Sequence, residues 1–176
     1  MQHKLAGSSR GSGMTLVESL VALVVLSVGM LGVAGLMLTG IASNRSALYR
    51  TQAVNLVSDM ADRIRANASA RIAYDSLGYG AAPAQHDCAP TQGQAGGNCT
   101  VAQLAEDDLA RWLESIRIAL PAFRGAPANG EVLVIPAGFA GQPDTYRINV
   151  RWQEPREQTP YSYQSDLVIL PRPPIN

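Results

Sequence analysis

A charge-free run near the start of the chain constrains the fold more than any other feature. Between Ser19 and Ala42 there are 24 residues without an ionisable side chain, and only Ser19, Ser27 and Thr39 are polar. As a helix this run is about 36 Å long, enough to cross a hydrocarbon core of about 30 Å. The rest of the sequence has the composition of an ordinary folded domain. We therefore expect one embedded helix followed by a domain.

The segment before this run has the wrong order for an ordinary secretory signal. Such a signal has a basic start, an apolar region of about 7–15 residues and then a cleavage site with small residues. Here residues 1–13, MQHKLAGSSRGSG, are polar and mildly basic, and the apolar run that follows is too long for a signal. Cleavage should therefore fall before the run and leave it as an anchor. The alternative is an uncleaved single-pass anchor.

The residues at this boundary resemble the processing motif of the type IV pilin family. That motif is a glycine, an apolar residue and then Thr-Leu-x-Glu, and here it reads Gly13, Met14, Thr15, Leu16, Val17, Glu18. The resemblance implies that a prepilin peptidase cuts after Gly13 and methylates the new amino terminus on Met14. Methionine stands where phenylalanine is commonest in the family.

Placing the Glu18 carboxylate beside an apolar run costs free energy unless its charge is paired. After cleavage, Met14 would carry a positive amino group one helical turn away. Glu18 would neutralise that group in its own chain or in a neighbouring subunit, and the family resemblance implies the second case, in which the pair sets the register of assembly. Alternatively, Thr15 and Glu18 form a capping box that satisfies backbone N–H groups at the helix start.

Two longer blocks resemble the minor pilins of the PilV type, namely residues 25–67 and the block CTVAQLAEDDLARWLESIRIALP. The resemblance implies a minor pilin that helps to initiate and assemble type IV pili, with roles in twitching motility and adhesion. Its partners would be other minor pilins, the major pilin, the prepilin peptidase, the inner-membrane assembly platform and membrane lipid. It would span the bacterial inner membrane once, with its carboxy-terminal domain in the periplasm, before it enters the pilus fibre at the cell surface.

Past the apolar run, an amphipathic stripe continues the same helix to Asn67. Its apolar members lie three or four residues apart: Tyr49, Ala53, Leu56, Met60 and Ile64. A second helix begins at a capping box of Thr100 and Gln103 and ends before the next proline. Asp108 falls inside the apolar arc of this helix. We expect it to make a structural hydrogen bond to nearby backbone or to the Trp112 N–H.

The last third of the chain predicts three short strands, at residues 131–135, 146–152 and 163–170. In the middle strand Tyr, Ile, Val and Trp alternate with Arg and Asn, which is typical of a strand with one buried face. Short connections favour an antiparallel sheet. We predict an α+β fold in which this small sheet packs on the long N-terminal helix, with a second helix and one disulfide loop. A short helix is also expected around Arg71 to Leu77.

Cys88 and Cys99 are the only cysteines. They predict one disulfide in an oxidising compartment, with two unpaired thiols as the alternative. A zinc site would need four ligands, and His86 is the only other candidate nearby. We expect no catalytic site, cofactor, metal or nucleic-acid partner, because the sequence has no nucleotide-binding motif or metal-ligand cluster and its arginines are interspersed with acids.

These interpretations divide the chain into a leader (1–13), the transmembrane and assembly half of the helix (14–42) and a periplasmic domain (43–176). Three other functions stay open at this stage. A minor pseudopilin of a type II secretion system would share the amino-terminal chemistry. A pilus-borne adhesin or DNA-uptake subunit would need an exposed aromatic or basic patch. A single-pass anchored protein unrelated to fibres would keep residues 1–13.

Overall fold

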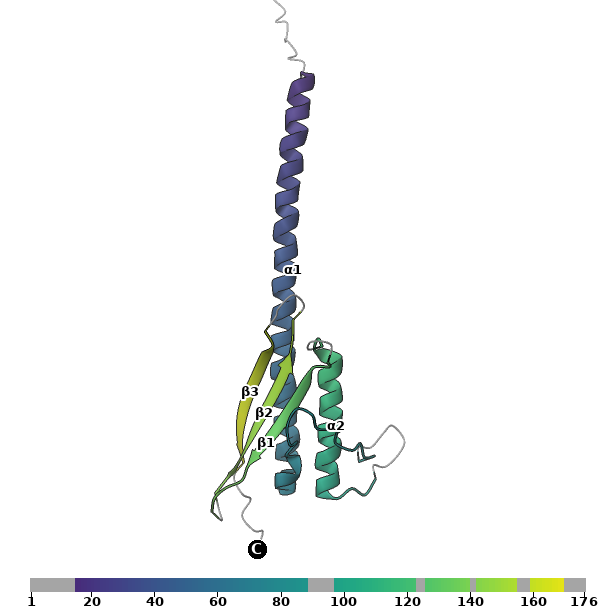
Figure 1. Ribbon diagram of the computed structural model, residues 1–176, viewed down its shortest axis with the longest axis vertical. Coiled ribbons are helices and arrows are strands. Elements are labelled where there is room, and N and C mark those ends of the chain that lie inside the picture. Colours follow the sequence, from purple (N-terminus) through teal and green to yellow (C-terminus); the bar gives the residue numbers. More distant parts are fainter. Residues whose placement is uncertain (1–14, 89–96, 123–125, 140–141, 155–158, 170–176) are drawn as a thin grey trace, which may run out of the picture. The chain divides into compact units, whose positions relative to one another are not determined.

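The computed structural model describes residues 15–88, 97–122, 126–139, 142–154 and 159–169. The predicted cleavage and methylation positions, Gly13 and Met14, lie outside these ranges. Contacts divide the chain into two compact units, Met1–Asn44 and Arg45–Asn176. The elements along the chain are α1 (Leu16–Ala66), η1 (Ala68–Tyr74), α2 (Val101–Ala119), β1 (Asn129–Ile135), β2 (Asp144–Trp152) and β3 (Tyr161–Ile169) (Figure 1).

In the first unit, α1 exposes every large apolar side chain by at least half, and Leu16 is 85% exposed. The hydroxyl groups in this stretch bond to their own helix. Ser27 Oγ donates to the Leu23 carbonyl at 2.7 Å, and Thr39 Oγ1 donates to the Gly35 carbonyl at 3.0 Å. These polar groups are therefore satisfied without water, as an apolar environment requires. By length and composition, α1 could cross a membrane.

The second unit is built on a three-stranded antiparallel sheet in the order β1-β2-β3. The central strand confirms the predicted alternation, because its core-facing residues are at most 2% exposed: Tyr146, Ile148, Val150 and Trp152. Each strand begins two residues before its predicted start, and the last predicted residue of the third strand, Leu170, lies outside the described residues. The predicted α+β fold is confirmed.

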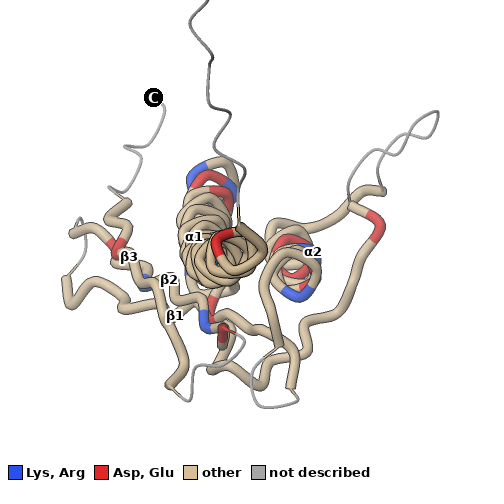
Figure 2. The backbone as a smooth tube through the Cα atoms, turned by 90° about the horizontal axis from the view of Figure 1, so that it is seen from above, with Lys and Arg blue, Asp and Glu red and all other residues tan. Residues whose placement is uncertain are grey.

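About the last six turns of α1, from Arg45 to Ala66, belong to this second unit, and they pack on both α2 and the sheet. The buried face of the helix consists of Ala53, Val57, Met60, Ala61 and Ile64. On one side, the buried Trp112 of α2 donates from its Nε1 to the Leu56 carbonyl at 2.8 Å. On another side, the Arg50 guanidinium lies 5.1 Å from the centre of the Tyr161 ring of β3. Figure 2, seen along α1, shows α2 and β3 on different sides of this helix.

Helix α2 begins at the predicted capping box, since Gln103 N donates to Thr100 Oγ1 and Thr100 N donates to Gln103 Oε1. Its apolar face is pressed closely against β1. A Cβ added at Gly130 would lie 2.4 Å from a ring carbon of Trp112 and 2.7 Å from Ile116 Cδ1. Only glycine allows the helix and the strand to approach this closely.

Two local predictions need correction. The short helix lies at Ala68–Tyr74 as a 3-10 segment interrupted at Arg71, whose φ is +44°. This unfavourable backbone conformation is held by tertiary contacts, since Arg71 Nε and Nη2 both donate to the Asp144 carboxylate. The role of Asp108 is structural as predicted, but the partners differ. It accepts from Tyr74 Oη at 2.7 Å and from Arg63 Nη1 at 3.1 Å.

Candidate functional site

The start of α1 is the first candidate site, and Thr15 caps it. Thr15 Oγ1 accepts from Glu18 N at 3.3 Å, and the Thr15 carbonyl accepts from Ser19 N at 3.2 Å. The other half of the predicted capping box is not formed. Among the described residues, no donor hydrogen-bonds to the Glu18 carboxylate and no cation pairs with it. The carboxylate is therefore exposed and free to meet a group from elsewhere.

The surroundings of Glu18 make an unpaired carboxylate costly in any apolar medium. It is flanked by exposed apolar side chains, namely Leu16, Val17, Leu20 and Val21. The first described cation along the chain is Arg45, about 40 Å away along the helix. The predicted partner is the amino group of Met14, which lies outside the described residues. A second subunit could bring the same group to this carboxylate.

Four glycines interrupt the apolar surface of the first unit. A Cβ added at Gly29, Gly32, Gly35 or Gly40 would meet no atom within 4 Å. Because α1 is continuous through all four, none of them serves a turn or an internal contact. Their lack of side chains leaves the helix backbone open to close approach by another helix.

The second candidate site is the disulfide predicted from sequence. Cys88 and Cys99 are bonded, with their Cα atoms 5.6 Å apart, so the alternative of two free thiols is wrong. The start of this loop is held by Asp107, a carboxylate that is 1% exposed. Asp107 accepts from His86 N at 2.9 Å and from Arg111 Nε at 2.7 Å.

Sequence reasoning missed Asp107 because its neighbour Asp108 lies nearer the middle of the apolar arc. The i, i+4 spacing of Asp107 and Arg111 was the available signal. The preceding residue, Glu106, is also engaged, since its carboxylate lies 2.8 Å from His86 Nε2 and accepts from Ala84 N. The contact with His86, and then that with Ala84 N–H, holds the pKa of Glu106 below its ordinary value. His86 thus fixes the loop to α2.

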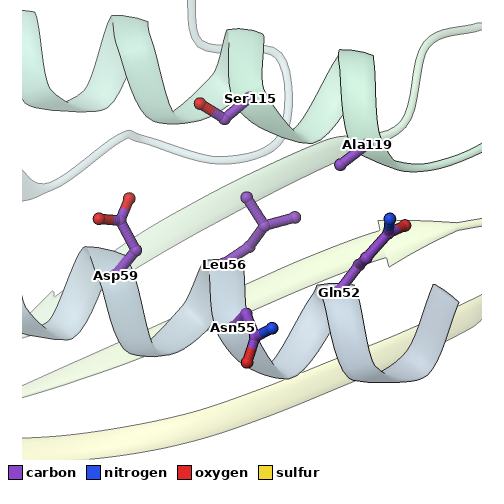
Figure 3. Close-up of a pocket in the computed structure, with 6 residues that line it drawn as sticks. All are labelled: Gln52, Asn55, Leu56, Asp59, Ser115 and Ala119. Atoms are coloured by element: carbon purple, nitrogen blue, oxygen red, sulfur yellow. The ribbon is translucent and has the colours of Figure 1, made fainter. Parts of the chain in front are cut away.

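A groove of about 290 Å³ lies between α1 and α2 on the surface of the second unit (Figure 3). It is lined by Gln52, Asn55, Leu56, Asp59, Ser115 and Ala119. The buried Oε1 atom of Gln52 has no hydrogen-bond partner among the described residues. Asp59 is already paired with Arg63 at 3.0 Å. The groove is open and shallow, and in the described part of the chain no group of three His, Cys, Asp or Glu side chains could hold a metal ion.

Comparison with known families places these features in context. A family model described as the prokaryotic N-terminal methylation motif matches residues 8–34, and one described as type IV pilin Tt1218 matches residues 35–110. The two matches adjoin and together cover more than half of the chain. The chain belongs to the type IV pilin family.

Family membership gives the two units their context. The methylation-motif match includes Gly13, Met14 and Glu18, and the pilin match runs from Gly35 in α1 into α2. Membership implies processing by a prepilin peptidase, membrane anchoring through the apolar helix and assembly with other pilins. The sheet of this pilin follows the matched residues. No curated protein and no solved structure matches the chain.

Proposed function

We propose that this pilin is a minor pilin resembling PilV, which helps to initiate and assemble type IV pili. In this proposal residues 1–13 are a leader, residues 14–42 are the membrane-spanning and assembly half of the helix, and residues 43–176 form a periplasmic domain. The precursor is held in the bacterial inner membrane, where it is cleaved after Gly13 and methylated on Met14. The mature subunit then enters the fibre. Its role is structural, without catalysis, and the assembly platform moves it.

The observation that supports this proposal is the Glu18 carboxylate, which lies on an apolar helix surface and has no hydrogen-bond or ion-pair partner among the described residues. A charge transferred to a low-dielectric fibre or membrane requires a partner of opposite sign. The amino group created at Met14 supplies one at the right spacing, four residues away. Within one chain the two charges can pair before assembly. In a fibre, the Met14 amino group of an incoming subunit can instead reach Glu18 of its neighbour, and the low dielectric strengthens that attraction.

Capping by itself does not account for the carboxylate. Thr15 already satisfies the Glu18 N–H through its hydroxyl group. If the carboxylate served only the helix start, its side chain would return to the backbone of Thr15, and no such bond is present among the described residues. The two roles can therefore be separated by mutation. Thr15→Ala removes the cap, and Glu18→Ala removes the charge.

The test follows both variants in the producing bacterium. We expect Glu18→Ala to be cleaved normally, as measured by the intact mass of the mature chain, but to be absent from sheared pili. Thr15→Ala is the matched control and should still be incorporated. Equal incorporation of both variants would refute charge pairing, and a wild-type mass that still includes residues 1–13 would refute processing.

Deletion of the gene distinguishes a pilus role from a secretion role. Loss of surface pili with intact protein secretion supports a minor pilin. Loss of secretion with intact pili would assign the chain to the pseudopilus of a type II secretion system instead. A mutant with normal pili that fails to adhere or to take up DNA would indicate a binding subunit.

A further inference from the structure

The two edge strands of the sheet in the second unit differ in whether another segment of the chain bonds to their outer backbone groups. The free edge of β1 is covered by the segment that follows η1. Ser76 N donates to the Val132 carbonyl at 2.9 Å, and Val132 N donates to Ser76 Oγ at 2.9 Å. Asp75 Oδ2 accepts from Val134 N at 3.3 Å, and Asn129 Nδ2 donates to the Tyr79 carbonyl. Backbone groups on this edge are therefore satisfied within the chain.

The opposite edge, at β3, lacks such a cover, and the register shows which backbone groups it presents. Because the N–H and C=O of Val132 point away from β2, Val132 and its partner Ile148 form a non-hydrogen-bonded pair. The backbone groups of Ile148 then point toward β3 and bond to Ser165, its partner there. Along β3 the direction alternates. The groups that point outward belong to Ser162, Gln164, Asp166 and Val168.

Among the described residues, none of these outward N–H and C=O groups has a hydrogen-bond partner. Apart from one charged side chain, Asp166, which is paired with Arg147 of β2, the strand lacks the features that usually protect an edge. It is nine residues long, is paired in continuous register with β2, and contains no Lys and no Pro. An edge of this kind is a template for an additional strand.

A ledge of partly buried side chains lies beside this edge and indicates which side chains the added strand must carry. Tyr161, Tyr163 and Ile169 are packed against the core but only partly buried. Val54 of α1 is 38% exposed. It lies one turn from Arg50, which stacks on Tyr161, and so faces the same side. A strand with apolar side chains toward α1 would cover this ledge, while polar side chains would lie beside Gln164 and Asp166 on the other face.

We propose that the β3 edge accepts an extended segment from a different pilin subunit, which continues the sheet as a fourth strand. The segment alternates apolar and polar residues over about seven to nine positions, to match the length of β3. This inference rests on the proposed function only for the identity of the partner as another pilin. The contact surface is separate from Glu18 and the start of α1.

A second copy of this chain fits the edge poorly. Its β1 edge cannot serve, because the Asp75–Tyr79 segment occupies it. Antiparallel pairing of two β3 strands would make the α1 segments that belong to the two second units run in opposite directions. Parallel pairing of two β3 strands requires a two-fold axis parallel to the strands, and this rotation turns one sheet over relative to the other. The apolar ledge of each copy would then meet the polar face of the other.

The test uses the full chain in the producing bacterium, with a photo-reactive benzoylphenylalanine at Gln164. The matched control carries the same group at Leu133, which is exposed on the same face of the sheet but in the covered strand β1. We expect irradiation to join Gln164, but not Leu133, to an alternating segment of another protein that carries the N-terminal methylation motif, identified by peptide mass spectrometry. No adduct, an adduct only with a second copy, or the same adduct from Leu133 would overturn the proposal.

A backbone variant tests the main-chain hydrogen bonds themselves. With the photo-reactive group at Ser162, Gln164→Pro removes one outward N–H and leaves the bonds to β2 intact, whereas Gln164→Ala keeps that N–H. Adduct yield should fall about fivefold in the proline variant, as expected for loss of one hydrogen bond, and stay unchanged in the alanine variant. Equal yields in two folded variants would refute strand addition. If Gln164→Pro does not fold, the proposal is tested by the comparison of the adducts formed from Gln164 and from Leu133.

Failure of this inference and failure of the proposed function give different results. If Glu18→Ala is excluded from pili while Gln164 yields no adduct, the protein is a pilin that does not accept a strand. If Gln164 yields a pilin adduct while Glu18→Ala is incorporated normally, the strand contact stands and the charge-pairing mechanism fails.

Discussion

The close contact between β1 and α2 at Gly130 makes a quantitative prediction about the second unit. In Gly130→Ala, the new Cβ would lie 2.4 and 2.7 Å from two ring carbons of Trp112 and 2.7 Å from Ile116 Cδ1. Ordinary contacts between carbon atoms are about 3.5–4.0 Å long, so the strand or the helix must move by about 1 Å. Both side chains are fully buried, and Trp112 is also tied to the Leu56 carbonyl. The site has little room to adjust.

The cost should therefore lie near the upper end of the range for overpacked cores, about 3 kcal/mol. For a chain of this size, such a loss lowers the unfolding midpoint by roughly 6–12 °C. The matched control is Gly138→Ala, where an added Cβ meets no atom within 4 Å. Both substitutions reduce the entropy of the unfolded chain in the same way, so that effect cancels in the comparison.

The assay is thermal unfolding of the full chain in detergent micelles, followed by tryptophan fluorescence. The only two tryptophans, Trp112 and Trp152, are both in the second unit, so the signal reports on that unit. We expect Gly138→Ala to unfold within about 2 °C of the wild type, as for a neutral surface substitution. Equal midpoints for the two glycine variants would show that α2 and β1 do not pack as closely as described here.

Three further predictions concern the contacts that hold the second unit together. Asp107→Asn should lower the free energy of unfolding by about 2 kcal/mol in urea titrations, because it weakens charge-assisted hydrogen bonds to a buried carboxylate; an unchanged midpoint would contradict that role. The pKa of Asp144 is held below its ordinary value, mainly by the hydrogen bonds from Arg71. This contact therefore stabilises the fold above about pH 4, and its contribution to stability is lost as the pH falls through the lowered pKa. Arg71→Ala should therefore flatten the pH dependence of the unfolding midpoint below pH 4, and an identical acid profile would argue against the ion pair. Replacing both Cys88 and Cys99 with alanine should cost about 3 kcal/mol on the chain-entropy account of a short loop, measured with the oxidised wild type as reference.

The features that sequence determined are those set by local pattern. The apolar run from Ser19 to Ala42 predicts a helix in an apolar environment, because it has no charge and few polar groups, and by length and composition α1 could cross a membrane. The capping box at Thr100 and Gln103 joins residues three apart, and the alternation along β2 repeats every second residue. Such short-range geometry is encoded by neighbours in the chain. The residues from Gly13 to Glu18 form a short local motif as well, and this motif indicated the type IV pilin family from sequence alone.

The features that sequence missed depend on contacts between distant segments. The local spacing to Arg111 marks Asp107 as an ion-pair partner, but contacts from distant segments give Asp107 and Asp108 their different roles: His86 N donates to Asp107, and the Tyr74 hydroxyl donates to Asp108. The φ of +44° at Arg71 exists because Asp144, far along the sequence, holds the side chain.

The closure of one sheet edge and the openness of the other likewise follow from tertiary structure. Ser76 reaches Val132 across 56 residues of sequence, whereas no described segment reaches the outer edge of β3. Local pattern determined which residues form each helix and strand. Only the packing of those elements decided which polar groups are satisfied within the chain and which are left for a partner, because a hydrogen bond between distant residues exists only once the fold has brought them together.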